Sequence, residues 1–341
     1  MNVLLARSAS LVGFPELVRE LGGDPGQLMN RVGLEVYLLD DLDQMMNSDA
    51  LSDLLDLCAS ELNCPSFGLL LSQRQGISIL GPVGLIMRQQ PTFQEAISAL
   101  QKYLHLHSEA GSFNLEISGD LAIIKYFPNV LGGDQSRQIT DLSLGVGCNV
   151  IRLYSGKAWK PRAVYFQHSM PPDLSLYTMT FRSPISFKQE FNGLVFDANI
   201  LKSTVDHYEP EMQRFLGVYL DGLERERPQS NVIQVQRMIK RLLPKGHCSL
   251  KEVASLMGYK ERSLQRRLKQ EGLTFQTLLD QIRQEIIKEL LGERELSLSM
   301  MAQRLGYAEL SVFSRAFKGW FGVPPSKYMS VLHESNSQLF R

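Results

Sequence analysis

Cysteine is scarce in this chain, and the few cysteines are not spaced as metal ligands. Four occur among 341 residues, and no two are separated by the two residues of a paired zinc motif. Cys58 and Cys148 fall within apolar helical patterns, so we expect them to be small core residues. The other two are Cys64 and Cys248. This spacing excludes a Cys-x-x-Cys metal site.

Long hydrophobic runs are missing as well. No apolar stretch reaches the roughly 20 residues that cross a bilayer. No cationic start leads into an apolar core and a cleavage site, as it would in a secretory signal. We therefore expect a cytoplasmic chain with reduced cysteines and no membrane partner.

Complete catalytic and metal-binding patterns are also absent. His105 and His107 lie two apart in a helical pattern and point to different faces, so they should be solvated or partly buried rather than metal ligands. Asp40-Asp41-x-Asp43 lacks the later glycine and glutamate of a calcium loop. Ser169 beside His168 has no evident third member of a hydrolase triad. We expect no catalytic residue, no metal, no cofactor and no enzyme activity.

Net charge is zero over the whole chain, but the charges are unevenly distributed. Residues 1–230 contain 18 Lys and Arg against 26 Asp and Glu, a balance of −8. Residues 231–341 contain 18 against 10, a balance of +8. Such asymmetry is typical of a chain in which one part meets a polyanion, although chance variation in surface charge would explain it about equally well on its own.

The first two thirds of the chain predict a mixed α+β domain. Helical patterns cover most of the first 60 residues, with Ser48 as the cap of a helix over 49–62, and Thr92 caps another helix. The stretch 65–84 is punctuated by glycines and predicts irregular structure. Phe113–Ser118 and Leu121–Phe127 alternate like strands around a tight hairpin at Gly119-Asp120. Further predicted segments are a helix over 137–154 and short strands near 162–167, 185–187 and 194–196.

The last third is nearly all helical, which divides the chain into four parts. We expect an N-terminal α+β domain over 1–205, a linker helix and linker over 206–231, an all-α domain over 232–331, and a tail over 332–341. The charged stretch 224–231 ends the linker helix.

Two segments of the all-α part repeat one pattern at a fixed offset. Ala254 and Ala302 are 48 positions apart, as are the pairs Gly258 and Gly306 and Tyr259 and Tyr307. After the Gly-Tyr the offset becomes 49, so that Leu264 matches Phe313, Arg266 matches Arg315 and Leu268 matches Phe317. A helix capped by Ser249, a turn at glycine and a second helix with an apolar i, i+4 pair together predict a helix-turn-helix unit, present twice.

The outward side chains of each second helix suit DNA. Arginine and glutamine match guanine and adenine edges in the major groove, and lysine matches phosphate. A helical bundle with a solvated basic face would explain one such unit, but two units in register, joined by a helix, make that alternative much weaker. The expected contacts are Lys260, Arg262, Gln265, Arg266 and Lys269 in the first unit, and Leu310, Ser311, Ser314, Arg315 and Lys318 in the second.

Residues 231–330 resemble the DNA-binding domain of the AraC/XylS family of bacterial transcription regulators. The segment from Phe313 to Tyr328, FSRAFKGWFGVPPSKY, is close to that family's signature. The resemblance implies seven helices, with recognition helices near 260–270 and 308–318. It places base contacts on Arg262, Gln265, Arg266, Leu310, Ser311, Ser314 and Arg315. Leu310 departs from the polar residue common there, and would contact a thymine methyl group or nothing.

Residues from about 20 to 205 resemble the N-terminal domain of the family branch called arabinose-binding-like. The motifs that carry the resemblance include Leu80-Gly81-Pro82-Val83-Gly84-Leu85 and Pro91-Thr92-Phe93-Gln94-Glu95-Ala96. The resemblance implies an effector-binding or self-association domain. Arg74, Arg88 and Arg137 are candidates for holding an effector carboxylate, against the simpler view that they are surface arginines.

These patterns predict a sequence-specific regulator, an activator rather than a repressor, whose N-terminal domain binds a small-molecule effector. Expected partners are promoter DNA, RNA polymerase, the effector and a second copy of the chain. Two alternatives stay open: a ligand-independent regulator whose N-terminal domain only dimerises, and a DNA-associated enzyme such as a repair methyltransferase, which would need a reactive cysteine. The first unit, richer in Arg and Gln, should contribute more base-specific energy than the second.

Overall fold

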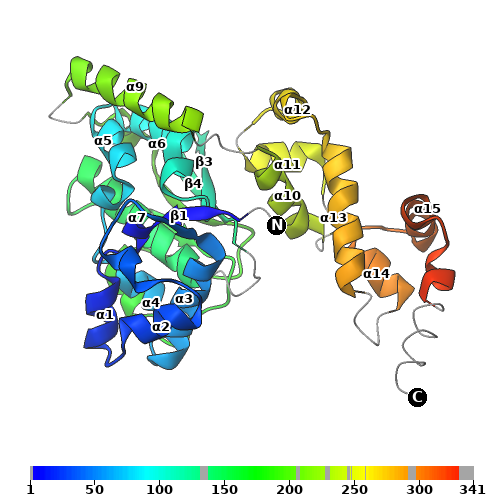
Figure 1. The fold of residues 1–341 in the computed structure, drawn as a ribbon. Helices are drawn as coiled ribbons and strands as arrows, with labels where there is room; N and C mark the ends of the chain where they lie inside the picture. The colour runs from blue at the N-terminus through cyan, green and yellow to red at the C-terminus, as the bar shows by residue number, and fades with distance from the viewer. Residues whose placement is uncertain are drawn as a thin grey trace. The chain divides into compact units, whose positions relative to one another are not determined.

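The computed structural model describes residues 3–130, 137–204, 208–226, 231–243, 246, 248–257, 259–290 and 297–329. The chain folds as two compact units, 1–229 and 230–341 (Figure 1). Gly258, residues 206, 207 and 227–230 of the predicted linker region, and the predicted tail 332–341 lie outside the described residues.

A five-stranded sheet forms one layer of the first unit. Its order is β3-β4-β7-β5-β6, antiparallel except for the parallel β5–β6 pair. Ser118 pairs with Leu121 across a two-residue turn in which Gly119 has φ +59°, so the predicted hairpin is confirmed. The strands are β3 (Gly111–Ser118), β4 (Leu121–Pro128), β5 (Ala163–Tyr165), β6 (Ile185–Ser186) and β7 (Asn192–Asp197).

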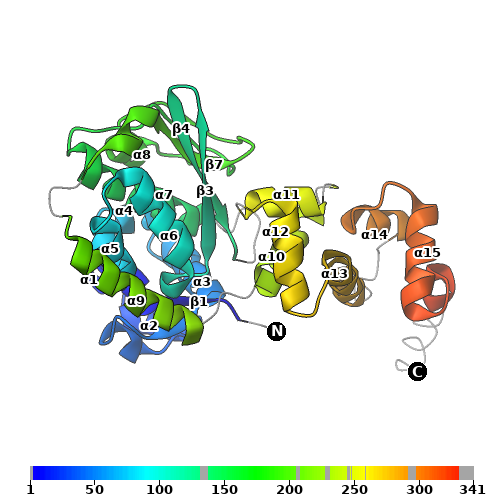
Figure 2. The same ribbon diagram turned by 90° about the horizontal axis from the view of Figure 1, so that it is seen from above.

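Helix α7 (Arg137–Ser155) links the two hydrophobic clusters of this unit. Its first turns contribute Ile139 and Leu142 to a cluster built with the N-terminal helices, and its later turns contribute Cys148 and Ile151 to a cluster against the sheet. Helices α6 and α7 both pack on the sheet (Figure 2). The other helices are α1 (Phe14–Glu20), α2 (Pro25–Arg31), α3 (Ser48–Glu61), α4 (Phe67–Ser72), α5 (Pro82–Arg88), α6 (Phe93–His107), α8 (Ser175–Phe181) and α9 (Pro210–Glu226).

Glycines allow α4 and α7 to approach closely. A Cβ atom on Gly68 would lie 2.1 Å from the backbone oxygen of Gln138, and one on Gly145 would lie 2.1 Å from Ser72 Oγ. The Gln138 side chain also accepts a hydrogen bond from Gly68 N at 2.8 Å and donates one to Pro65 O at 2.8 Å. Side chains larger than hydrogen would separate the two backbones.

Three local predictions for this unit are wrong. The stretch 65–84, predicted irregular, contains α4, a 3₁₀ turn over Ile77–Leu80 and the start of α5, because its glycines serve packing and turns rather than breaking helices. The cap of α3 is Asn47 rather than Ser48, since the Asn47 side chain accepts from Asp49 N and Ala50 N. The first 60 residues also contain a two-stranded sheet, β1 (Leu5–Arg7) with β2 (Met45–Asn47), whose three-residue strands are too short to alternate visibly.

The predicted linker helix, α9, belongs to the first unit. Leu216 and Leu220 are buried in the cluster that also contains the sheet residues. Asp221 accepts hydrogen bonds from Tyr103 at 2.6 Å and from Lys102 at 2.7 Å, both on α6. This helix is therefore packed on α5 and α6 along one side.

The second unit is helical and has two small cores. One is formed by α10 to α13, and the other by the end of α13 with α14 and α15. Helix α13 serves both, through Leu278 and Ile282 in the first core and Ile287 and Leu290 in the second. The labelled helices are α10 (Asn231–Leu242), α11 (Leu250–Leu256), α12 (Glu261–Gln270), α13 (Phe275–Leu290), α14 (Leu298–Arg304) and α15 (Leu310–Phe321), and residues 325–329 are helical as well.

Candidate nucleic-acid interface and effector cavity

The repeat in the sequence is a repeat in the structure. Helices α11 and α14 begin and end 48 residues apart, whereas α12 and α15 begin 49 apart. Ser249 and Ser297 cap α11 and α14 by accepting a hydrogen bond from the backbone N–H three residues on. The offset changes in the turn, where Lys260 directly follows Tyr259 as the cap of α12 but Ala308 separates Tyr307 from the cap of α15.

Each turn is closed in the same way. Tyr259 N donates to Ala254 O at 2.8 Å, and Tyr307 N donates to Ala302 O at 2.9 Å. Gly306 has φ +72°, a left-handed conformation that favours glycine, and a Cβ there would lie 3.1 Å from Leu243 O. The second glycine therefore serves both the turn and the packing against the end of α10.

The apolar pairs predicted to point inward are fully buried. Leu264 and Leu268 of α12 and Phe313 and Phe317 of α15 each have 0 % exposure. With one face of each helix buried in this way, the opposite face is turned to solvent.

That solvent-facing side contains the residues predicted to contact DNA. All are exposed except the half-buried Ser314: Lys260, Arg262, Gln265, Arg266, Lys269, Leu310, Ser311, Arg315 and Lys318. Within the part of the chain that the structure describes, the six cations of this set pair with no carboxylate. These six are defined here as the free cations: Lys260, Arg262, Arg266, Lys269, Arg315 and Lys318.

The two recognition faces differ in character. The α12 face has four of the free cations, and the α15 face has two. The start of α15 is instead partly apolar, with Leu310 43 % and Val312 40 % exposed. Val312 was not among the predicted contacts, whereas Leu310 was predicted from its position in the family resemblance. Ser311 Oγ donates to Glu309 at 3.2 Å, so a carboxylate also lies at the start of this helix.

Two other arginines, Arg267 and Arg283, contact the tyrosines of the two turns. Arg267 lies over the Tyr259 ring, with its guanidinium carbon 4.7 Å from the ring centroid. Arg283 of α13 lies 4.2 Å from the Tyr307 centroid and donates from Nε to Leu305 O at 3.1 Å. Arg283 thus fixes the second turn to the connecting helix, a role that no sequence pattern indicated.

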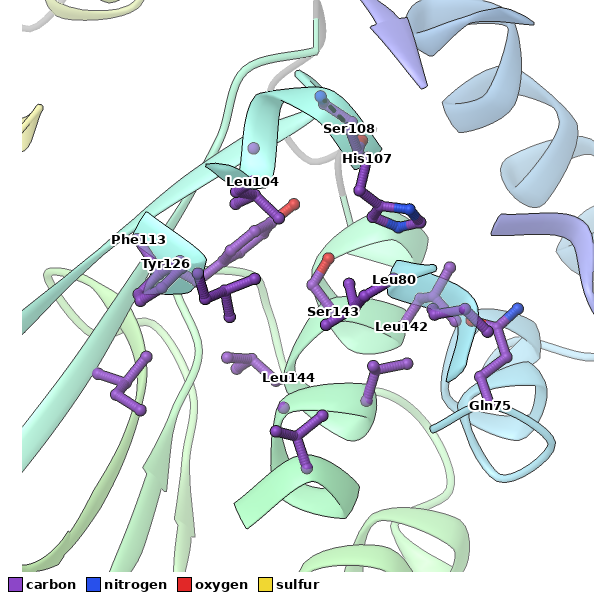
Figure 3. Close-up of a pocket in the computed structure, with 18 of the residues that line it drawn as sticks. Gln75, Leu80, Leu104, His107, Ser108, Phe113, Tyr126, Leu142, Ser143 and Leu144 are labelled. Atoms are coloured by element: carbon purple, nitrogen blue, oxygen red, sulfur yellow. Dashed lines mark hydrogen bonds between the residues drawn. The ribbon is translucent and has the colours of Figure 1, made fainter. Parts of the chain in front are cut away.

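The first unit contains an apolar cavity of about 170 Å³. It lies between α6, α7 and the sheet, and its lining contains no Lys, Arg, Asp or Glu side chain among the described residues. Figure 3 shows His107 and Ser143 beside apolar side chains such as Leu104, Phe113 and Leu144. Burial lowers the pKa of His107 to about 3, with a further effect from the Arg7 charge, so the imidazole is neutral at physiological pH.

The three arginines proposed for an effector lie elsewhere. Arg74 pairs with Glu20, Arg88 is exposed in the last turn of α5, and Arg137 lies 3.5 Å from the Asp141 carboxylate. None of them lines the cavity. The structure does not bring them together there, and their contact with an effector carboxylate stays a prediction.

A buried polar cluster surrounds Asp141, which is fully buried. Its carboxylate accepts from Tyr177, lies beside Arg137, and is 3.1 Å from His168 Nε2. The other ring nitrogen of His168 meets the backbone oxygen of Ser169 rather than its hydroxyl. The arrangement is therefore a core network and places no serine nucleophile on the histidine.

The cysteines are poorly suited to nucleophilic chemistry. Burial raises the pKa of Cys58 to about 12, and those of Cys148 and Cys248 to about 11. Burial also raises the pKa of Cys64. Because the thiolate is the nucleophile, these shifts argue against the repair-enzyme alternative. Cys58 and Cys148 are core residues, as predicted.

His105 and His107, predicted to be solvated or partly buried, are both buried, with 7 % and 5 % exposure. Asp43 pairs with Arg7. Among the described residues, no group of three or more His, Cys, Asp or Glu is placed to hold a metal ion. No helix in the same set is long and apolar enough to span a bilayer.

Known families match both units. Residues 22–205 match the arabinose-binding domain found at the N-terminus of AraC transcription regulators. Residues 253–330 match a helix-turn-helix domain, and this segment begins within α11 and covers the rest of both repeated units.

Individual relatives are regulators as well. The HTH-type transcriptional regulator VirS of Mycobacterium tuberculosis is 30% identical over 326 residues, covering 95% of this chain and 96% of that protein. The ornithine utilization regulator of Pseudomonas aeruginosa is 25% identical over 272 residues, covering 77% of this chain and 78% of that protein. The crystal structure of the regulator CdpR from the same species has 19% identity and a TM-score of 0.45, over 89% of this chain and 97% of that one. The chain belongs to the AraC family of transcription regulators, DNA-binding proteins rather than enzymes, with an arabinose-binding-type N-terminal domain and a double helix-turn-helix domain.

Proposed function

We propose that this regulator binds promoter DNA sequence-specifically by placing α12 and α15 in successive major grooves. The observation that carries this proposal is the set of six free cations, which lie opposite the buried faces of the two equivalent helices. Unpaired Lys and Arg on exposed helices are the groups that phosphate and base edges attract. Successive grooves on one side of B-DNA are about 34 Å apart, so the footprint of one chain is asymmetric.

An effector in the N-terminal unit controls this binding. The cavity supports this part of the proposal, because well-packed protein interiors contain few voids larger than a water molecule. A ligand that fits one conformation better than another shifts the population toward it. In the alternative, a ligand-independent regulator, filling the cavity would leave DNA binding unchanged.

The chain forms a homodimer through the outer face of α9. Four apolar side chains there are exposed, with Phe215 66 % and Val218 70 % exposed beside Met212 and Tyr219. A single helix face of this kind is typical of an interaction surface. We propose that a second copy covers it.

Charge favours an antiparallel pair of α9 helices. With Val218 on the two-fold axis, Glu211 of one copy lies opposite Arg225 of the other, and both residues are exposed. Phe215 then lies near Gly222 of the second copy, where the space around a Cβ atom is open. The two Glu211–Arg225 pairs and the Phe215 ring over Gly222 make the contact self-complementary.

The dimer can be tested on the full chain by light scattering after gel filtration. The double change Phe215→Asp and Val218→Asp should convert a dimer to a monomer, whereas Met170→Asp, at a residue 63 % exposed outside α9, should not. A dimer that persists in the double variant would show that another surface, or the second unit, joins the copies. A wild-type monomer would contradict the proposal outright.

As an activator, the chain contacts RNA polymerase near the promoter and acts in the cytoplasm, where bacterial promoters lie. Genomic footprinting of the full chain, followed by transcription in vitro from the recovered promoters, tests this proposal. We expect asymmetric sites with two protected major grooves per chain and increased initiation on addition of effector. Symmetric sites with one protected groove per chain, or reduced initiation, would contradict it.

A further inference from the structure

We propose that the effector is an uncharged, ring-sized apolar molecule with one hydroxyl group, bound in the cavity between α6, α7 and the sheet. This inference rests on the proposed effector control but goes further, because it names a chemical class. It also differs from the carboxylate suggested by Arg74, Arg88 and Arg137.

Two buried polar atoms in the cavity lining have no partner among the described residues. They are Nδ1 of His107, a side chain 5 % exposed, and Oε1 of Gln75, a side chain 4 % exposed. The Gln75 amide is held in place because its Nε2 donates to Ser10 O and Val12 O, each at 2.9 Å. Buried polar atoms are normally hydrogen-bonded, so these two indicate that a ligand completes them.

Apart from three serines and Tyr126, the remaining lining is apolar and would reject a charge. Leucine, isoleucine, valine and phenylalanine side chains make up most of it, and no Lys or Arg of the described residues lines it. The desolvation free energy of an unpaired carboxylate or ammonium group in such a site is far larger than the stabilisation from one hydrogen bond. The Gln75 oxygen only accepts a hydrogen bond, whereas a neutral imidazole nitrogen either donates or accepts, so a hydroxyl group suits these atoms and a carbonyl group would leave the Gln75 oxygen unpaired.

The size of the cavity limits the ligand to about one ring. Its volume of about 170 Å³ is close to that of a cavity of roughly 150 Å³ that binds benzene in another protein. A single ring with a short substituent would fill it, and a sugar would leave its hydroxyl groups unpaired against leucine and phenylalanine.

Three probes of nearly equal shape test the class: 4-ethylphenol, ethylbenzene and 4-ethylbenzoate. Calorimetry and thermal unfolding of the full chain at neutral pH should show 4-ethylphenol binding most tightly and raising Tm with concentration. Ethylbenzene should bind about tenfold more weakly, because it leaves the polar atoms unpaired. The charged 4-ethylbenzoate should bind more weakly still. Equal or tighter binding of 4-ethylbenzoate would overturn the proposal.

Two variants locate the binding. Gly147→Leu should fill the cavity and abolish binding of both neutral probes without lowering the Tm of the free chain, since the nearest atom to a Cβ there is Leu194 Cδ1 at 3.7 Å. Gly217→Leu makes the same change on α9, away from the cavity, and should leave binding intact. His107→Phe should remove the preference for 4-ethylphenol over ethylbenzene while both still bind. A preference that survives His107→Phe would contradict the assigned role of the imidazole.

A failure of this inference is distinguishable from a failure of effector control. If neither neutral probe binds the wild-type chain, the assigned chemical class of the effector is wrong, independently of any result on DNA binding. Transcription in vitro can be compared for wild type and Gly147→Leu, each with and without added cell extract. If the probes bind as expected but all four measurements agree, the proposed binding site is retained and the proposed effector control is contradicted.

Discussion

At the residue scale, arginines with similar exposure have different roles. Arg266 is exposed and unpaired, whereas its neighbour Arg267 lies on the Tyr259 ring. Adjacent positions on a helix point about 100° apart, so Arg267 can turn toward the Tyr259 ring while Arg266 stays in solvent. The charge pattern alone does not distinguish them.

Replacing Arg266 or Arg315 by alanine should weaken specific DNA binding by about 1–3 kcal/mol and relax sequence preference at one base pair each. The physical reason is the loss of a bidentate contact to a base edge. Selection from a randomised site followed by anisotropy titration measures both effects. Arg267→Ala is the matched control and should leave the preference unchanged. Unchanged preference in both the Arg266 and Arg315 variants would show that the recognition faces are wrongly assigned.

A single carboxyl group should make the first unit sensitive to pH. Burial raises the pKa of Asp56 from 3.8 to about 7, with Asp53 and Asp141 adding to the shift and Arg137 opposing it. A raised folded-state pKa favours folding below the unfolded value, and this contribution is lost as pH rises from about 4 through about 7. Asp56→Asn should therefore be more stable than wild type above about pH 8, by on the order of 2 kcal/mol after screening.

Urea unfolding of the two chains at about pH 5 and about pH 8 measures this effect. The difference between variant and wild type isolates Asp56, because the lowered pKa of His107 acts in the opposite sense and is common to both chains. If the difference in unfolding free energy between Asp56→Asn and wild type is the same at both pH values, the pKa of Asp56 is not raised.

At the element scale, the contact between α4 and α7 depends on the absence of side chains. Gly68→Ala should destabilise the first unit by about 1–3 kcal/mol, because its Cβ would meet the Gln138 backbone oxygen. Gly147→Ala, on α7 itself, should instead stabilise it by up to about 1 kcal/mol, since alanine favours the helix and space is open. Thermal unfolding gives both values. A neutral Gly68→Ala would mean that the two helices separate at little cost.

The two recognition helices should also contribute unequally. The α12 face contains Arg262, Gln265 and Arg266, whereas α15 begins with exposed Leu310 and Val312. We expect a larger loss of specificity from Arg266→Ala than from Arg315→Ala, and equal losses in the randomised-site experiment would contradict this order.

At the scale of the whole molecule, DNA binding should depend steeply on salt. Each phosphate neutralised by a free cation contributes about 0.9 to the slope of log K against log salt, through release of condensed counterions. Lys269→Gln should reduce the slope by about 1 and weaken all DNA sequences alike. Lys240→Gln is the control, because Lys240 Nζ already pairs with Glu285 at 3.0 Å. If Lys269→Gln left the slope unchanged, this lysine would lie off the DNA.

The amino-acid sequence by itself determined the second unit in detail. Its repeat, its serine caps and its buried pairs depend on spacing within about 20 residues, and helix periodicity records such spacing directly. The change of offset from 48 to 49 indicated one extra residue in the second unit between Tyr307 and Phe313, and the structure shows Ala308 between Tyr307 and the cap of α15. The hairpin at Gly119 was predictable for the same reason.

Only the tertiary structure decided the arrangement of the first unit and the place of its cavity. The glycines of 65–84 suggested loops, but Gly68 and Gly84 lie where another backbone approaches within 2.1 and 2.3 Å of a Cβ position. The lining of the cavity comes from residues between Ser10 and Leu194, so no local pattern marks it. The sequence suggested arginines as ligands for an effector carboxylate. In the fold, the cavity is instead lined by a neutral histidine, His107, and a glutamine, Gln75. Contacts between residues distant in the chain create such a cavity, and helix or strand periodicity does not predict them because it reflects only local spacing.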